Sequence, residues 1–121
     1  MAEEKTYSEA EVRERLQREL PGWEYRDGWI RRTYITPGFA HTLLLANAIG
    51  YIAEAAWHHP DLTLGYAKVT VKLQTHSARG ITDKDFELAR EIERLALWRP
   101  AEGSALPGYP KNWVRPEKKS D

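Results

Sequence analysis

The sequence predicts an α+β fold: an antiparallel four-stranded sheet with three helices packed on one face, in the order α-β-β-α-β-β-α. Two pairs of β-prone segments indicate two hairpins, and a long apolar segment of helical character separates them. A length of 121 residues with 41% hydrophobic content suits one domain with one modest core. We therefore expect one domain over residues 1–98, followed by an irregular Pro/Gly-rich tail over residues 99–121.

Local signals indicate the first helix and the first hairpin. Ser8 and Glu11 have the spacing of a capping box, and apolar residues then recur every four positions until Pro21. Asp27 and Gly28 lie between two aromatic, β-prone runs, which is the strongest short signal for a two-residue hairpin turn. We expect a helix after Ser8 and two antiparallel strands around this turn.

The second helix is predicted from the apolar run after Pro37. Thr36 is placed to cap it, with Pro37 at the first helical position, and residues 38–57 are too long and alanine-rich a run for a strand. Apolar side chains lie nearly all round this helix, so one small sheet does not cover them. We expect a homodimer or homotetramer that forms through this helix.

The second hairpin and the third helix follow. The stretch "LTLGY" is a short strand candidate, and residues 67–75 alternate between apolar and polar side chains, as in a half-buried strand. Thr82 and Asp85 repeat the capping-box spacing, and apolar residues then recur at intervals of three and four to near Trp98. The tail holds four of the seven prolines and has no apolar period, so it predicts neither helix nor strand. Its Tyr109 and Trp113 are candidates to dock it on the domain.

Composition narrows the classes of function. Eighteen basic and eighteen acidic residues give no net field toward nucleic acid or an anionic membrane, so we expect no direct nucleic-acid partner. The absence of cysteine excludes disulfides, thiolate metal sites and cysteine nucleophiles. No signal-peptide pattern and no run of roughly 18 apolar residues is present, so we expect a cytoplasmic protein with no membrane partner.

Three of the four histidines, His58, His59 and His76, are candidate acid/base residues. If the end of the second helix and the end of the alternating strand converge, these imidazoles surround one pocket. The ordinary imidazole pKa, about 6.5, suits proton transfer at neutral pH. The structural alternative stays open, because histidines and Pro60 are also common at a helix C-terminus. For His76 the alternative is a solvated side chain without a catalytic role, because the strand alternation places it away from the core face.

Two further readings of these residues compete with the acid/base hypothesis. The capping box alone accounts for Asp85. A zinc site is conceivable from three histidines, but the adjacent pair lacks the i, i+4 spacing that places two ligands on one helical face. We therefore expect neither a metal nor a cofactor.

The residues around these histidines resemble the pterin-4a-carbinolamine dehydratase family. The family pattern has an acidic residue, a His-His-Pro triplet, an aromatic residue, a histidine and an aspartate. Every spacing of that pattern fits Glu54, His58, His59, Pro60, Tyr66, His76 and Asp85. The resemblance covers about residues 8–97 and leaves the tail outside it. It departs at Trp57, where an aspartate is often found, and at Leu62, where tryptophan is common.

The resemblance implies a hydro-lyase, 4a-hydroxytetrahydrobiopterin dehydratase. Such an enzyme removes water from 4a-hydroxytetrahydropterin to give quinonoid dihydropterin, which recycles the cofactor of aromatic amino acid hydroxylases. Elimination delivers one proton to the departing hydroxyl at C4a and withdraws another from N5, and imidazoles can do both. The implied roles are acid and base for His58 and His59, and binding or polarisation of the pterin hydroxyl for His76. Asp85 would orient His76.

Five more residues are implied substrate-binding candidates. Glu54 would orient His58 across an i, i+4 gap, although an exposed helical glutamate is the commoner explanation. Trp57 borders the expected pocket, and Pro60 fixes the turn that holds the histidine pair. The backbone near Thr75 and Ser77 would bind the pterin ring.

A non-catalytic role is the alternative function. The same family resemblance includes a vertebrate dimerisation cofactor of a homeodomain transcription factor and bacterial relatives that resemble Rubisco assembly chaperones. The intact histidine motif favours the enzyme. Trp57, Leu62 and the tail favour an interaction role, in which the tail contacts a protein partner.

Overall fold

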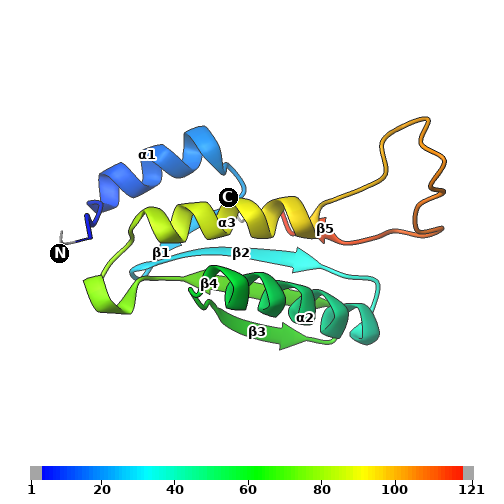
Figure 1. Ribbon diagram of the computed structural model, residues 1–121, viewed down its shortest axis with the longest axis horizontal. Helices are drawn as coiled ribbons and strands as arrows, with labels where there is room; N and C mark the ends of the chain where they lie inside the picture. Colours follow the sequence, from blue (N-terminus) through cyan, green and yellow to red (C-terminus); the bar gives the residue numbers. More distant parts are fainter. Residues whose placement is uncertain (1–3, 119–121) are drawn as a thin grey trace.

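The computed structural model describes residues 4–118, in which one antiparallel sheet is backed by helices (Figure 1). Its two hairpins meet along their inner strands, so that the strand order is β1-β2-β4-β3. The α+β fold expected from the sequence is confirmed. The four strands of this path are β1 (Glu24–Arg26), β2 (Trp29–Ile35), β3 (Asp61–Gly65) and β4 (Lys68–Leu73).

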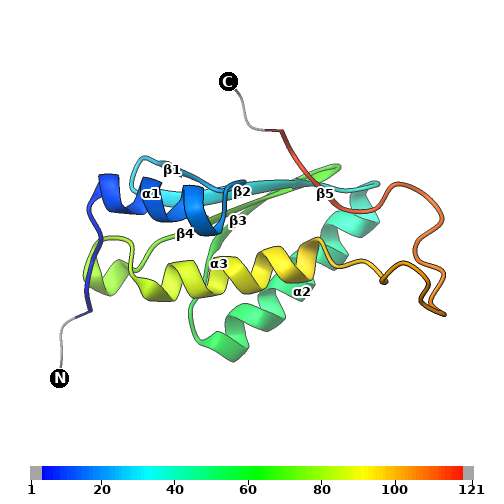
Figure 2. The ribbon, with the colours of Figure 1, turned by 90° about the horizontal axis from the view of Figure 1, so that it is seen from above.

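Three α-helices supply the second layer, α1 (Glu9–Glu19), α2 (Phe39–Ala56) and α3 (Asp83–Ala96). Figure 2 shows α2 and α3 below the sheet, with α1 beside the β1 edge. The capping boxes predicted for α1 and α3 are both present. Within residues 4–118, no helix combines the length and the apolar character needed to cross a membrane.

The predicted start of α2 is wrong. Gly38, not Thr36, is the N-cap residue, and it makes no side-chain capping bond. The amide of Thr36 still donates to the carbonyl of Ala67 at 2.8 Å, which keeps this residue in line with β2. Its hydroxyl instead bonds the Thr42 hydroxyl at 2.8 Å, inside the first turn of the helix.

The β1–β2 turn has the backbone that its sequence predicts. Asp27 and Gly28 both adopt the left-handed conformation, with φ of 53° and 85°. Two consecutive positive φ angles match a type I′ turn, whose twist suits a two-residue hairpin. The register of the strands is therefore set locally, with Arg26 opposite Trp29.

A carboxylate on α3, that of Glu93, ties this helix to β2. Glu93 accepts hydrogen bonds from the Trp23 indole at 3.2 Å, the Tyr34 hydroxyl at 2.6 Å and two nitrogens of Arg32 at 3.2 and 3.0 Å. Trp23 and Tyr34 are fully buried. Burial, followed by the charge of Glu93, raises the pKa of Tyr34 above its ordinary value, so that its hydroxyl remains a donor.

The tail docks on the domain and adds a short strand, β5 (Arg115–Pro116), to the sheet. This strand pairs with Tyr34 and Ile35 at the end of β2, so the expectation that no strand forms in the tail is wrong at these two residues. Arg99 donates to the carbonyls of Trp98 and Val114 and thereby closes the base of the intervening loop.

Two aromatic residues of the tail lie against the start of α2. The ring of His41 packs edge-on against Tyr109 and Trp113, with centroid distances of 5.1 and 5.3 Å. The docking predicted for Tyr109 and Trp113 is therefore confirmed. The loop and its return to β5 lie at the right of Figure 1, in orange and red.

Replacing Glu93 by alanine is expected to lower the free energy of unfolding by about 2 to 4 kcal/mol, because Arg32 then stays buried without its carboxylate. Glu91→Ala is the matched control. Among residues 4–118, Glu91 pairs only with Arg94, on the exposed surface, so its loss should change stability by about 0.5 kcal/mol or less. Urea denaturation followed by circular dichroism measures both. Equal effects of the two substitutions would contradict the role given to Glu93.

Candidate functional site

The buried carboxylate of Asp85 is the centre of the candidate site. Asp85 is 0% exposed, and as residue N3 of α3 it accepts the Thr82 amide at 3.0 Å, which completes the capping box. The same oxygen accepts the Thr75 hydroxyl at 2.7 Å. The other oxygen lies 2.6 Å from Nε2 of His58. One side chain therefore links the end of β4, the start of α3 and the end of α2.

His58 reaches Asp85 because α2 ends abruptly. Trp57 caps the helix in the left-handed conformation, with φ of 54° and ψ of 46°, and the His58 amide donates to the carbonyl of Ala53 at 3.1 Å. A positive φ is strained for a bulky residue. This reversal turns His58 toward α3, where its ring is mostly buried. Pro60 follows, half-buried, and directly precedes β3.

His59 lies in a different environment from its neighbour. Its Nε2 lies 2.7 Å from a carboxylate oxygen of Glu54, and the Glu54 side chain is 68% exposed. The expectation that Glu54 orients His58 is therefore wrong. The left-handed Trp57 ends the helical i, i+4 relationship, so the next histidine comes to lie beside Glu54. The Trp57 ring, 76% exposed, stands edge-on to His59 at 5.1 Å.

His76 opens a short 3₁₀ helix, η1 (His76–Ala78), directly after the Thr75 that bonds Asp85. Its exposed ring packs edge-on against Trp29 at a centroid distance of 5.7 Å. The expectation that Asp85 orients His76 is wrong, because its carboxylate binds His58 and the Thr75 hydroxyl. Asp85 therefore supports His76 only through the adjoining backbone.

The segment before α1 lies across this end of the molecule. Glu4 pairs with Lys84 on the first turn of α3 and accepts a long hydrogen bond from the Ser77 hydroxyl at 3.4 Å. The hydrogen bond from Lys84 holds the pKa of Glu4 below its usual value. Glu4 and Lys84 are thus neighbours of the site that no sequence pattern indicated.

His58 also borders a hollow of about 240 Å³ between α2 and α3, and neither His59 nor His76 lines it. The structure thus brings His58, Asp85 and Thr75 into one hydrogen-bonded network, with His59 and His76 on exposed surfaces beside it. Within residues 4–118, no group of three or more histidine, aspartate or glutamate side chains is arranged to hold a metal ion.

The His58–Asp85 pair has the geometry of a base and the group that orients it. A carboxylate that holds one ring nitrogen fixes the imidazole, and the opposite nitrogen can then accept or deliver a proton. A purely capping role was the structural alternative for Asp85, and the structure shows that this residue caps α3 and bonds His58 at once. The hydroxyl of Thr75 was missed, because only its backbone was expected to contribute.

Comparison with known proteins gives a consistent result. The sequence profile of the family described as "Pterin 4 alpha carbinolamine dehydratase" matches residues 5–95. A curated relative from Aquifex aeolicus is 46% identical over 88 residues, which cover 73% of this chain and 88% of the relative. A relative from Roseiflexus sp. is 42% identical, with 73% and 94% covered. Both are named putative pterin-4-alpha-carbinolamine dehydratases.

Two solved structures share the fold. A transcriptional coactivator/pterin dehydratase from Brucella melitensis superposes with a TM-score of 0.69 at 30% identity, over 76% of this chain and 99% of that one. A pterin dehydratase-like protein, identified as a RuBisCO assembly factor in the alpha-carboxysome, has a TM-score of 0.52 at 16% identity, with 62% and 87% covered. The second likeness shows the fold alone.

Two carboxylate–histidine pairs, the buried His58–Asp85 pair and the exposed His59–Glu54 pair, offer a matched test of burial. Asp85→Ala is expected to lower the free energy of unfolding by about 3 to 5 kcal/mol, because it removes a cap and leaves buried donors unpaired. Glu54→Ala, at an exposed pair, should change it by about 0.5 kcal/mol or less. Thermal and urea unfolding provide the measurement. If Glu54→Ala lowered the free energy of unfolding as much as Asp85→Ala does, the larger contribution assigned to the buried pair would be refuted.

Proposed function

The chain belongs to the pterin-4a-carbinolamine dehydratase family, and on that premise we propose that it dehydrates 4a-hydroxytetrahydropterin to quinonoid dihydropterin, in tetrahydropterin recycling. The observation that carries the proposal is the buried Asp85 carboxylate bonded to His58 at 2.6 Å. This pair joins two positions of the family pattern that are 27 residues apart in sequence. The reaction is a hydro-lyase reaction, in which the C4a–oxygen bond breaks.

The proposed chemistry needs two proton transfers. One imidazole withdraws the proton from N5, and the electron pair of that bond forms the C4a=N5 double bond. A second imidazole delivers a proton to the hydroxyl at C4a, which leaves as water. We assign these two roles to His58 and His59, and we assign polarisation of the hydroxyl to His76. Atoms and charge balance without a further reactant.

The surrounding residues are proposed to position the pterin. Trp57 presents an exposed flat ring beside His59, which suits stacking against a bicyclic heterocycle. The Thr75 amide already donates to the Gly80 carbonyl at 2.9 Å, so we place the backbone contact to the ring at Ser77. The hydroxyl of Thr75 holds Asp85. Glu54 orients His59, and Pro60 fixes the turn after the pair.

We expect His58→Ala, His59→Ala and His76→Ala each to reduce dehydration turnover by roughly 10² to 10⁴, as for loss of a general acid or base. His41→Ala is the control, because His41 contacts the tail rather than the site, and it should leave the rate near that of the wild type. Stopped-flow absorbance with freshly generated carbinolamine measures the rate. Near-full activity in all three site variants would exclude this catalytic assignment.

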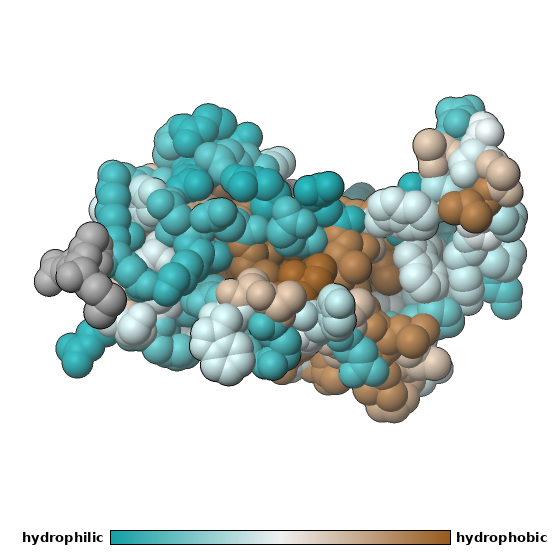
Figure 3. All heavy atoms as spheres, viewed as in Figure 1, coloured by the Kyte–Doolittle hydropathy of each residue, from teal (hydrophilic) through white to brown (hydrophobic). Residues whose placement is uncertain are grey.

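A protein-interaction role is the second candidate, and the exposed apolar surface favours it. Several apolar side chains on the outer face of α2 are exposed, and Figure 3 shows hydrophobic residues gathered there. They are Phe39, Leu43, Leu44 and Tyr51. The Brucella relative is named a coactivator as well as a dehydratase. Dehydration at a useful rate supports the enzyme, whereas specific capture of a protein by the tail without dehydration supports the interaction role.

The same surface supports our proposal that the chain forms a homodimer or homotetramer through α2. Leu44 on α2 and Leu106 in the tail are matched in exposure, at 60% and 59%. Leu44→Lys is expected to shift the wild-type assembly toward monomer, because it places a charge in the apolar contact. Leu106→Lys should preserve the assembly. Analytical ultracentrifugation at micromolar concentration measures the oligomeric state of all three proteins. A wild type that is only monomeric would remove the proposal.

A further inference from the structure

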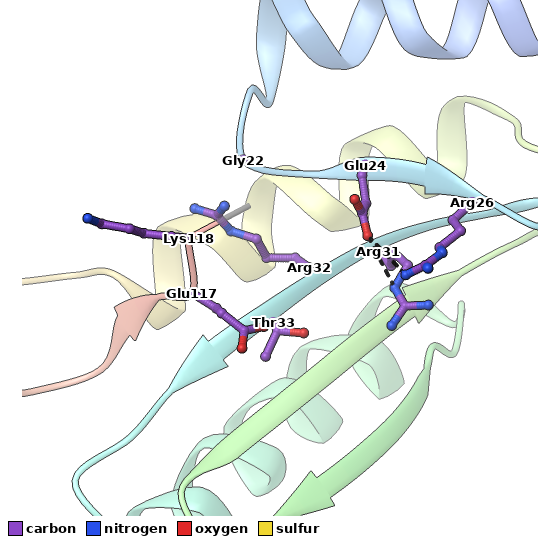
Figure 4. Close-up of a pocket in the computed structure, with 8 residues that line it drawn as sticks. All are labelled: Gly22, Glu24, Arg26, Arg31, Arg32, Thr33, Glu117 and Lys118. Atoms are coloured by element: carbon purple, nitrogen blue, oxygen red, sulfur yellow. Dashed lines mark ion pairs between the residues drawn. The ribbon is translucent and has the colours of Figure 1, made fainter. Parts of the chain in front are cut away.

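A second, unassigned cleft lies at the edge of β2, between β1 and the tail. Both β1 and β5 pair along this same edge, β1 as far as Arg31 and β5 from Tyr34. The Glu117 amide extends the tail contact to the Thr33 carbonyl at 3.0 Å. The space between these two segments is a cleft of about 330 Å³ (Figure 4).

Cationic side chains predominate in this cleft. Four of its residues are basic and two are acidic, and the charge of Arg32 is already paired with Glu93, so the lining carries a surplus of one positive charge. The residues are Gly22, Glu24, Arg26, Arg31, Arg32, Thr33, Glu117 and Lys118. Figure 4 shows Arg26 and Arg31 on one side of the cleft and Arg32 and Lys118 on the other. A concave site that is lined in this way attracts anions.

Arg32 presents a rigidly held donor to the cleft. Its side chain is 8% exposed, and Glu93 fixes Nε and Nη2. The third nitrogen, Nη1, has no hydrogen-bond partner within residues 4–118. It is not sealed from solvent, because no fully buried side-chain polar atom in that range lacks a partner. Nη1 lies against Gly22, where a Cβ atom would fall 1.7 Å from it, so a larger residue at this position would displace the guanidinium.

The other two arginines are only weakly neutralised. Arg31 and Arg26 share one carboxylate, that of Glu24, at 3.7 and 3.9 Å, which is longer than a hydrogen bond. Lys72 is the cross-strand partner of Arg31 and adds another positive charge to the same face of the sheet. Arg31 therefore keeps donors available for an incoming anion.

The tail completes the site, and it lies outside the family match. Glu117 and Lys118 lie beyond the matched residues 5–95. The match covers 94% of the Roseiflexus relative, so a tail of this length has no counterpart there. The cleft shares no lining residue with the network of His58, Asp85 and Thr75.

We propose that this cleft binds a small phosphorylated metabolite through its phosphate monoester group. Guanidinium groups match the geometry of phosphate oxygens, and Nη1 of Arg32 is pre-oriented for one of them. A phosphate monoester carries a charge of about −1.5 to −2 at neutral pH, which complements the positive surplus of the lining together with the neighbouring Lys72 better than a monocarboxylate does. The volume lies near the lower end of the range for small-molecule sites, roughly 300 to 1,000 Å³.

The test is calorimetric titration of the full chain with inorganic phosphate, methyl phosphate and acetate at constant ionic strength. The two phosphates are expected to bind saturably and acetate to bind at least about tenfold more weakly, because it lacks the second charge. Arg31→Gln and Lys118→Gln should each weaken phosphate binding, Arg31→Gln by about tenfold or more.

Lys111→Gln is the control, since it removes the same charge from the tail outside the cleft. It should leave phosphate affinity unchanged. The proposal is overturned if phosphate fails to saturate, if acetate binds equally well, or if Lys111→Gln weakens binding as much as Arg31→Gln does. Because the readout is binding and not dehydration, its failure is distinct from failure of the proposed catalytic function.

Discussion

The three elements that form the candidate site are held together at one buried carboxylate, Asp85. Its two oxygens accept the amide of Thr82, the hydroxyl of Thr75 and a ring nitrogen of His58, and its side chain is 0% exposed. A buried carboxylate is stable only when such donors satisfy it. The requirement to satisfy Asp85 therefore fixes the relative positions of β4, α2 and α3.

The left-handed residue Trp57 separates two adjacent histidines into unlike environments. His58 turns inward to a buried carboxylate, while His59 turns outward to the exposed Glu54. A buried pair restricts its imidazole, whereas an exposed pair leaves the ring mobile and screened by solvent. Acid/base chemistry benefits from two groups whose surroundings differ, as they do for this pair. Strain at Trp57 is thus linked directly to the proposed division of roles.

Local signals in the sequence were sufficient for most of the fold and insufficient for the contacts of the site. Capping boxes and the Asp27 turn act within a few residues, so they could be predicted. The partners of His58 and His59 could not, because they depend on a left-handed backbone that a bulky tryptophan rarely adopts. Strand β5 could not be predicted either. Pro116 has no backbone N–H to donate, and β5 forms because it pairs with the end of β2, a contact between segments far apart in sequence.

In the proposed reaction, Asp85 holds His58 through Nε2, and Nδ1 exchanges protons. Nitrogen-15 NMR of the histidine rings checks this arrangement, because the two neutral tautomers have distinct spectra. Neutral His58 should carry its proton on Nε2 and lose this preference in Asp85→Asn. A neutral His58 protonated on Nδ1, or a tautomer that is unaffected by Asp85→Asn, would contradict it.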